Sequence, residues 1–193
     1  MTNQRNEKMN LVAAARQQAA VVLEDIHDPH NAAAVLRSCE AFGIPEVFLI
    51  FKEEKKFNPA KIGPASSASA NSWLQFHTFS SHEECFATLR QRGFSTVATV
   101  LDSAVESLFS ANFSEQKIAW LFGNEHRGLS PEIVAAADRK IHIPMSGFVQ
   151  SLNLSVTAGI CLFETTRQRR NGEWQNFLLP EGEQRELIAE WTK

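Results

Sequence analysis

Short, mostly apolar runs separated by polar, turn-forming segments recur along the chain. These runs are nearly continuous rather than alternating, and they lie near residues 20–23, 47–51, 74–79, 94–101, 118–122 and 139–143. Continuous apolar runs are typical of parallel strands that are covered on both faces. The pattern therefore predicts an α/β fold with a mostly parallel sheet and helices on both faces.

Helical periodicity fills the gaps between these runs. Ser81, followed three residues later by Glu84, forms a capping box that predicts a helix over 81–92. Asn153 precedes a long apolar pattern, which predicts an N-capped helix from Leu154 that protein encloses on most sides as far as Phe163. Further helices are expected over 31–42 and 131–137, and the small, polar segment 64–70 is expected to be helical or irregular.

Length and composition indicate one soluble domain. The 193 residues, 44% of them hydrophobic, are expected to fold as a single domain, 1–193, with an N-terminal helix at about 2–18 and a C-terminal helical tail at about 171–193. The apolar runs are shorter than the roughly 20 residues of a membrane span, and the first residues do not resemble a secretion signal. Three cysteines without a CxxC spacing favour a reducing cytoplasm.

The net charge of −3 argues against indiscriminate binding of polyanions but permits a local basic face. Arg167, Arg169 and Arg170 form one such cluster. Two explanations stay open for it, because cations complement a helix C-terminus and also contact RNA. His27 and His30 have no third ligand at a suitable spacing, so no metal is expected.

Three polar loops follow predicted strands, at 24–31, 123–130 and 145–153. Parallel sheets bind ligands beyond the carboxyl ends of their strands, so these loops are the candidate site. No GxGxxG follows the first strand, which weakens a dinucleotide-binding interpretation. Ser151 and Asn153 have a purely structural alternative as capping and loop-closing residues.

Three segments resemble, in order, the three motifs of the SPOUT methyltransferases of the SpoU/TrmH type. They are HDPHNAAAVLRSCEAFGI, LFGNEHRGLSPE and IPMSGFVQSLNLSVTAGICLFETTRQR. The resemblance implies a C-terminal deep trefoil knot, a homodimer, S-adenosylmethionine as methyl donor and no metal. It also implies methylation of a ribose 2′-hydroxyl in RNA.

Details such as PHN and FVQSLN are most similar to members that act on guanosine 18 of tRNA, and the lack of room for an additional RNA-binding domain also favours tRNA over rRNA. The alternatives are an rRNA 2′-O-methyltransferase and a non-catalytic RNA-binding dimer of the same fold.

The resemblance also implies roles for individual residues. The catalytic set is Arg37, Asn31, Glu125, Ser151 and Asn153, and the cofactor-binding set, acting mostly through backbone atoms, is Thr99, Leu121, Gly123, Ile143, Met145 and Leu152. The family mechanism often casts the arginine as general base, but a guanidinium stays protonated, so Arg37 is instead expected to grip an RNA phosphate and stabilise the developing alkoxide. A surface ion pair with Glu40 or Asp28 is its structural alternative. The role of His126 is left open.

Overall fold

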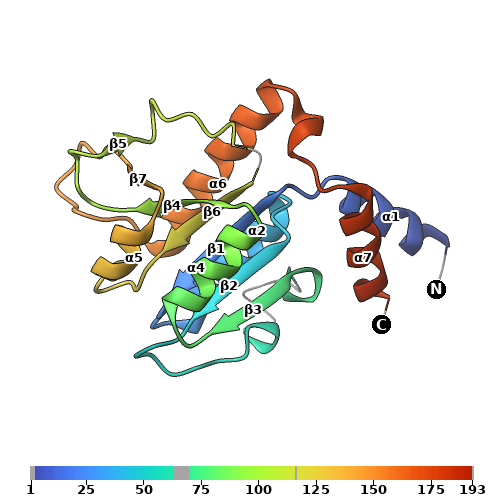
Figure 1. Ribbon diagram of the computed structural model, residues 1–193, viewed down its shortest axis with the longest axis horizontal. Helices are drawn as coiled ribbons and strands as arrows, with labels where there is room; N and C mark the ends of the chain where they lie inside the picture. The colour runs from blue at the N-terminus through green and yellow to red at the C-terminus, as the bar shows by residue number, and fades with distance from the viewer. Residues whose placement is uncertain (1–2, 63–69, 116, 193) are drawn as a thin grey trace.

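The computed structural model describes residues 3–62, 70–115 and 117–192, which form an α/β fold around a seven-stranded parallel sheet (Figure 1). The sheet order is β3-β2-β1-β6-β4-β7-β5. The strands are β1 Ala19–Glu24, β2 Glu46–Ile50, β3 Gln75–Phe79, β4 Ser95–Thr99, β5 Glu106–Ser107, β6 Ile118–Phe122 and β7 Arg139–His142. The α-helices are α1 Asn3–Ala14, α2 Pro29–Ala41, α4 His82–Gln91, α5 Pro131–Ala136, α6 Leu154–Asn171 and α7 Glu181–Trp191, and the 3-10 turns are η1 Pro59–Lys61, η2 Ala70–Trp73 and η3 Trp174–Phe177.

Successive side chains of the central strands point to opposite faces of the sheet and pack in two separate apolar layers. Val21 of β1 and Trp120 of β6 pack in a layer that also holds Leu36 of α2 and Leu162 of α6. On the other face, Val22, Phe48 and Leu121 pack in a layer with residues of α4 and α5. β1, β2 and β6 are therefore fully buried, which explains why their sequences are continuous apolar runs.

The predicted order of strands and helices is confirmed, with differences at the ends of elements. α1 ends at Ala14, before the predicted limit near residue 18, because the N–H groups of Gln17 and Gln18 bond to the backbone of Gly43 and Phe177 instead. β5 was not predicted, since two residues carry no periodicity. Of the segment 64–70, residues 64–69 lie outside the described residues, and Ala70 begins η2.

The prediction that protein encloses α6 on most sides as far as Phe163 holds except for one exposed apolar strip. One side of the helix packs in the core through Ala158, Cys161 and Leu162, which are fully buried. Val156 and Phe163, however, are 48% and 55% exposed. The sequence cannot separate a helix buried all round from one that shows an apolar strip, because both read as apolar.

The two terminal helices pack against each other at one end of the molecule, away from the sheet (Figure 1). Arg16 fastens this pair to the body: its guanidinium donates to the carbonyl of Glu40 at 3.2 Å and lies over the ring of Trp191. Gly43 lets the segment after α1 pack closely against the end of α2. It has φ +72°, and an added Cβ would lie 2.8 Å from the carbonyl oxygen of Ala15.

Candidate active site at the carboxyl ends of the strands

The loop after β1 is fixed by Asp25, which adopts φ 46°. The Asp25 carboxylate accepts hydrogen bonds from the successive N–H groups of Lys52, Glu53 and Glu54, so the loops after β1 and β2 are joined. Asp28 then caps α2 by accepting the N–H of His30 at 2.8 Å. Asn31 is thereby placed in the first turn of the helix.

The loop after β6 is a closed turn from Asn124 to Gly128. The backbone groups of these two residues bond to each other in both directions, at 2.8 and 3.0 Å. The side chain of Asn124 accepts the N–H groups of His126 and Arg127 and donates to the carbonyl of Asp25 at 2.7 Å. Gly123 is required here, since an added Cβ would lie 2.2 Å from backbone atoms of Gly128.

Glu125 connects this turn to the first loop. Its carboxylate accepts the N–H of His27 at 2.9 Å, the N–H of Asp28 at 3.2 Å and the side-chain amide of Asn31 at 2.9 Å. Burial raises the pKa of Glu125, but hydrogen bonds from Asn31 and from backbone N–H groups outweigh it, and the net pKa is lowered. Glu125 is therefore a bound anion that orders the loops rather than a ready proton acceptor.

The third loop joins the same network at the start of α6. The side-chain oxygen of Asn153 accepts the N–H of Ser155 at 2.8 Å, which is the predicted N-cap. Its side-chain nitrogen donates to the amide oxygen of Asn31 at 3.1 Å. The chain Glu125–Asn31–Asn153 thus links all three predicted loops through side-chain hydrogen bonds, and capping and loop linkage are both real functions of Asn153.

A cavity of about 570 Å³ lies among these loops at the carboxyl ends of β4, β6 and β7. Its volume falls within the range of small-molecule sites. Nine of the eleven predicted site residues line it: Asn31, Thr99, Gly123, Glu125, Ile143, Met145, Ser151, Leu152 and Asn153. The cavity combines apolar side chains with exposed loop backbone, which suits a ligand that has a flat heterocycle and polar ends.

Leu121 and Arg37 are the two predicted residues that do not line the cavity. Leu121 is buried inside the sheet, and its carbonyl accepts the Thr99 hydroxyl at 3.1 Å, so it supports the wall from behind. Arg37 is exposed on α2. The ion-pair alternative for Arg37 finds no support, because Glu40 pairs with Arg16 and Asp28 caps α2.

Several cavity residues were not predicted as site residues. His126 and Arg127 stand on the second loop, Thr157 lies in the first turn of α6, and Phe122, Leu129 and Val134 supply apolar wall. The apolar positions carry no chemical signature in a sequence. His126 did carry a signal, since it is an imidazole inside the second motif.

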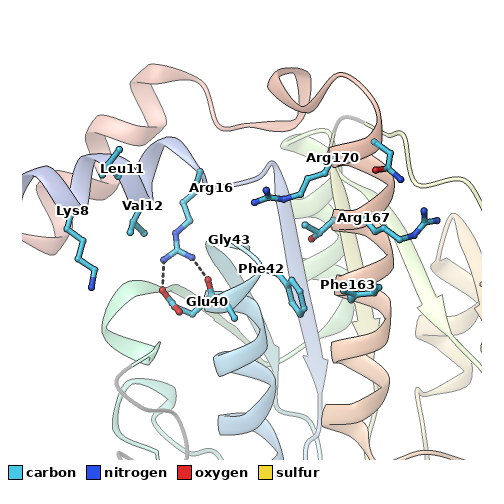
Figure 2. Close-up of a pocket in the computed structure, with 14 residues that line it drawn as sticks. Lys8, Leu11, Val12, Arg16, Glu40, Phe42, Gly43, Phe163, Arg167 and Arg170 are labelled. Atoms are coloured by element: carbon cyan, nitrogen blue, oxygen red, sulfur yellow. Dashed lines mark hydrogen bonds and ion pairs between the residues drawn. The ribbon is translucent and has the colours of Figure 1, made fainter.

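A second cavity, of about 710 Å³, is lined by residues of α1 and of the C-terminal ends of α2 and α6 (Figure 2). None of its lining residues comes from the three loops. Arg170 points into the space between α1 and α6, whereas Arg167 points away (Figure 2) and pairs with Glu164 at 2.7 Å. This cavity is larger, yet it holds none of the predicted chemistry.

The arginine cluster at the end of α6 divides by burial. Arg169 is 1% exposed, donates to the side-chain oxygen of Gln17 and the carbonyl of Glu115, and lies over the ring of Phe177. Burial lowers its pKa to about 10. Arg169 is therefore structural, and the two explanations given above apply only to the exposed Arg167 and Arg170.

Membrane-spanning and metal-binding features are both absent from the part of the chain that the structure describes. No helix there is both long and apolar enough to cross a membrane. No group of three or more His, Cys, Asp or Glu side chains there is arranged to hold a metal ion. Cys39, Cys85 and Cys161 are free and buried, and burial raises the pKa of the Cys39 thiol to about 12.

Residues 18–163 match the model of the SpoU rRNA Methylase family. The chain is 35% identical over 184 residues to a tRNA (guanosine(18)-2'-O)-methyltransferase of Escherichia coli K12, covering 93% of this chain and 78% of that one. It is 34% identical over 197 residues to a protein of the same description from Thermus thermophilus, covering 100% and 97%. The solved structure of the Aquifex aeolicus TrmH/SpoU tRNA modifying enzyme matches with a TM-score of 0.87 at 31% identity, covering 97% and 94%. The cofactor-bound SpoU methyltransferase AviRb of Streptomyces viridochromogenes matches with a TM-score of 0.71 at 25% identity, covering 81% and 63%.

Proposed function

This chain belongs to the SpoU rRNA methylase family, and we propose that it is the methyltransferase that modifies the ribose 2′-hydroxyl of guanosine 18 in tRNA, with S-adenosylmethionine as donor. One observation carries the proposal. Three loops, at 24–31, 123–130 and 145–153, converge on one cavity and are bonded to each other through Glu125, Asn31 and Asn153. The fold alone brings the strand ends together, but a scaffold that had lost its chemistry would not need these side-chain hydrogen bonds between the loops.

The cavity fits S-adenosylmethionine by its donor set. Thr99, Gly123, Ile143, Met145 and Leu152 line it from the ends of β4, β6 and β7, where backbone N–H and C=O groups are available to the adenosine and the amino-acid end. The apolar wall receives the adenine ring. When bound, the donor supplies an electrophilic methyl group on a sulfonium. This chain contributes position, since holding two reactants in line removes roughly 7–11 kcal/mol of barrier.

The polar side of the cavity receives the ribose. The cavity is lined on this side by Asn31, Ser151 and Asn153, which supply hydrogen-bonding groups near the N-terminal ends of α2 and α6. Arg37 stands outside this cavity on the exposed side of α2. We assign it the RNA phosphate next to the reacting nucleotide, where a permanent cation also stabilises negative charge that develops on the 2′-oxygen.

A homodimer explains why Arg37 is exposed and why α6 shows an apolar strip. Val156 and Phe163 on α6 are about half exposed, and in the loop before α6 Phe148 and Val149 are 108% and 64% exposed. Large exposed apolar patches mark interaction surfaces. A second copy that covers this face completes the site by bringing its own loops towards Arg37.

We further assign to residues 1–193 one SPOUT domain that works in the cytoplasm and whose C-terminal part forms a deep trefoil knot. The similarity to the TrmH/SpoU structure along 97% of this chain supports the knot. Pulling the chain from both ends tests it, because an unknotted chain extends to its full contour of roughly 3.3–3.6 Å per residue. A knotted chain stops short of that length.

tRNA is favoured over rRNA by the extent of the similarities. The family model covers 18–163, which leaves out α1 and α7, whereas the Thermus tRNA methyltransferase matches along the whole chain. The 23S rRNA methyltransferase RlmB of Nitrosomonas europaea is covered over only 61% of its length. The similarity to the Thermus tRNA methyltransferase thus includes α1 and α7, which the family model leaves out.

The direct test is methyl transfer from labelled S-adenosylmethionine to a tRNA transcript, followed by nuclease digestion and mass mapping. The expected product is a single 2′-O-methylguanosine at position 18, absent from a transcript with adenosine at that position. Calorimetric titration with S-adenosylmethionine accompanies it. If the protein binds RNA but neither binds the donor nor modifies the transcript, it is the non-catalytic RNA-binding dimer instead.

A further inference from the structure

Methylation of a ribose hydroxyl releases a proton. The 2′-oxygen forms a bond to the methyl carbon, the carbon–sulfur bond breaks with its electron pair going to sulfur, and the hydroxyl proton must leave. An acceptor positioned in the site accelerates such a step by about 10²–10⁴-fold. We propose, on the basis of the function assigned above, that His126 is the catalytic residue that takes this proton and passes it to water.

The polar groups that line the cavity leave few alternatives. Glu125 is held by three N–H donors that lower its pKa, so its carboxylate is a weak base. Arg127 is a guanidinium and stays protonated. The other polar side chains of this wall are amides and hydroxyls, which do not accept protons near neutral pH. His126 carries the one lining side chain, among the described residues, of a type that changes charge between about pH 5 and 8.

The backbone holds His126 in place without involving its ring. Its N–H donates to the side chain of Asn124 at 2.9 Å, inside the turn that Asn124 and Gly128 close. His126 lines the cavity and its side chain is exposed, so the residue stands where the site opens to solvent. A proton acceptor needs access to the substrate and to solvent, because it must release its proton to water after each turnover.

The ring of His126 also has a defined neighbour. It meets the ring of His27 edge to face, with centroids 5.3 Å apart. His27 in turn contacts Glu54 through Nδ1 at 3.2 Å, and Glu54 is also contacted by Asn124 and Arg127 at 3.3 Å each.

The charged groups around the pair are thus Glu125 and Arg127 on its own turn, His27 after β1, and Glu53 and Glu54 after β2. Glu53 is paired with Arg127. His27 and Glu54 fix the orientation of the His126 ring and are positioning residues.

The test is the single-turnover rate of methyl transfer to tRNA as a function of pH, for the wild type and His126→Asn. The wild-type rate is expected to rise with pH, because a general base acts only in its unprotonated form. In His126→Asn the rate falls about 100-fold or more and this rise disappears, while the Kd for S-adenosylmethionine and the KM for tRNA change less than threefold. Added imidazole restores part of the rate of His126→Ala.

His82→Asn is the matched control, because His82 lies at the start of α4, outside the cavity, and pairs with Glu83. It is expected to keep the wild-type profile. Two results with an active wild type overturn the inference and leave the methyltransferase function intact. One is a His126→Asn rate within threefold of the wild type, and the other is a His126→Asn rate that rises with pH as the wild-type rate does. A wild type that transfers no methyl group overturns both.

Discussion

Replacement of Glu125 by Gln tests whether one carboxylate organises the site. The glutamine keeps one acceptor oxygen but directs an NH₂ group at a position where N–H donors of His27, Asp28 and Asn31 now converge. A hydrogen bond to a charged group contributes roughly 1.5–3 kcal/mol. Because Glu125 is only partly buried, water replaces some of what is lost, and we expect a destabilisation of about 1–2 kcal/mol.

The pH dependence gives this prediction its sign. The folded-state pKa of Glu125 is lowered from 4.5, so its stabilisation is complete above about pH 5 and is lost as the carboxylate takes up a proton below that. In a chain of this size, 1 kcal/mol shifts Tm by about 2–4 °C, so Glu125→Gln is expected to melt about 2–8 °C below the wild type at pH 7. The gap narrows as the pH falls below 4.5 and towards the lowered pKa of the folded state.

Thermal unfolding followed by circular dichroism, at fixed protein concentration from pH 3.5 to 7, measures this gap. Calorimetry with S-adenosylmethionine should show weaker binding, because Glu125 orders the loops that line the cavity; a full 1–2 kcal/mol lost from binding raises the Kd by about 5- to 30-fold. Glu186→Gln, on the exposed side of α7, is the control and should match the wild type. Equal Tm values at pH 7, or a gap that does not change with pH, would refute the reasoning.

Three further predictions concern single positions. Arg37→Ala should abolish methyl transfer while leaving the Kd for S-adenosylmethionine within about threefold; equal loss of both would remove Arg37 from its assigned role. Gly123→Ala should cost more than about 3 kcal/mol, seen in chemical denaturation, since its Cβ would lie 2.2 Å from the backbone of Gly128; wild-type stability would show that the turn can open. Phe163→Glu should convert the proposed dimer into monomers in analytical ultracentrifugation and lower activity with it, whereas Phe109→Glu, at an exposed position after β5, should not; a Phe163→Glu dimer would place the interface elsewhere.

The sequence predicted where the three loops lie better than it predicted the surface. Strand ends of a parallel sheet lie at one edge, so the meeting of the three loops follows from the order of elements alone. The bond between Asn31 and Asn153 does not, because it depends on side-chain geometry between residues 122 positions apart. The exposed strip of α6 was missed for a related reason, since Val156 and Leu162 have the same polarity and differ only in what lies opposite.

Burial also changed the interpretation of polar residues. Arg169 looked like part of a basic surface but is buried against Gln17 and Phe177. Arg16 is buried as well, and it anchors the terminal helices. Nothing in the local sequence distinguishes a buried arginine from an exposed one.

The link from Asn31 to Asn153 also fixes when, during synthesis, the donor pocket can first exist. The first loop leaves the ribosome early, but its bonding partner at the start of α6 emerges only after four-fifths of the chain has been made. A bound small molecule can therefore stabilise the pocket only after the chain has been synthesised beyond Asn153. A shortage of the methyl donor in the cell should leave the yield of folded chains unchanged until that stage.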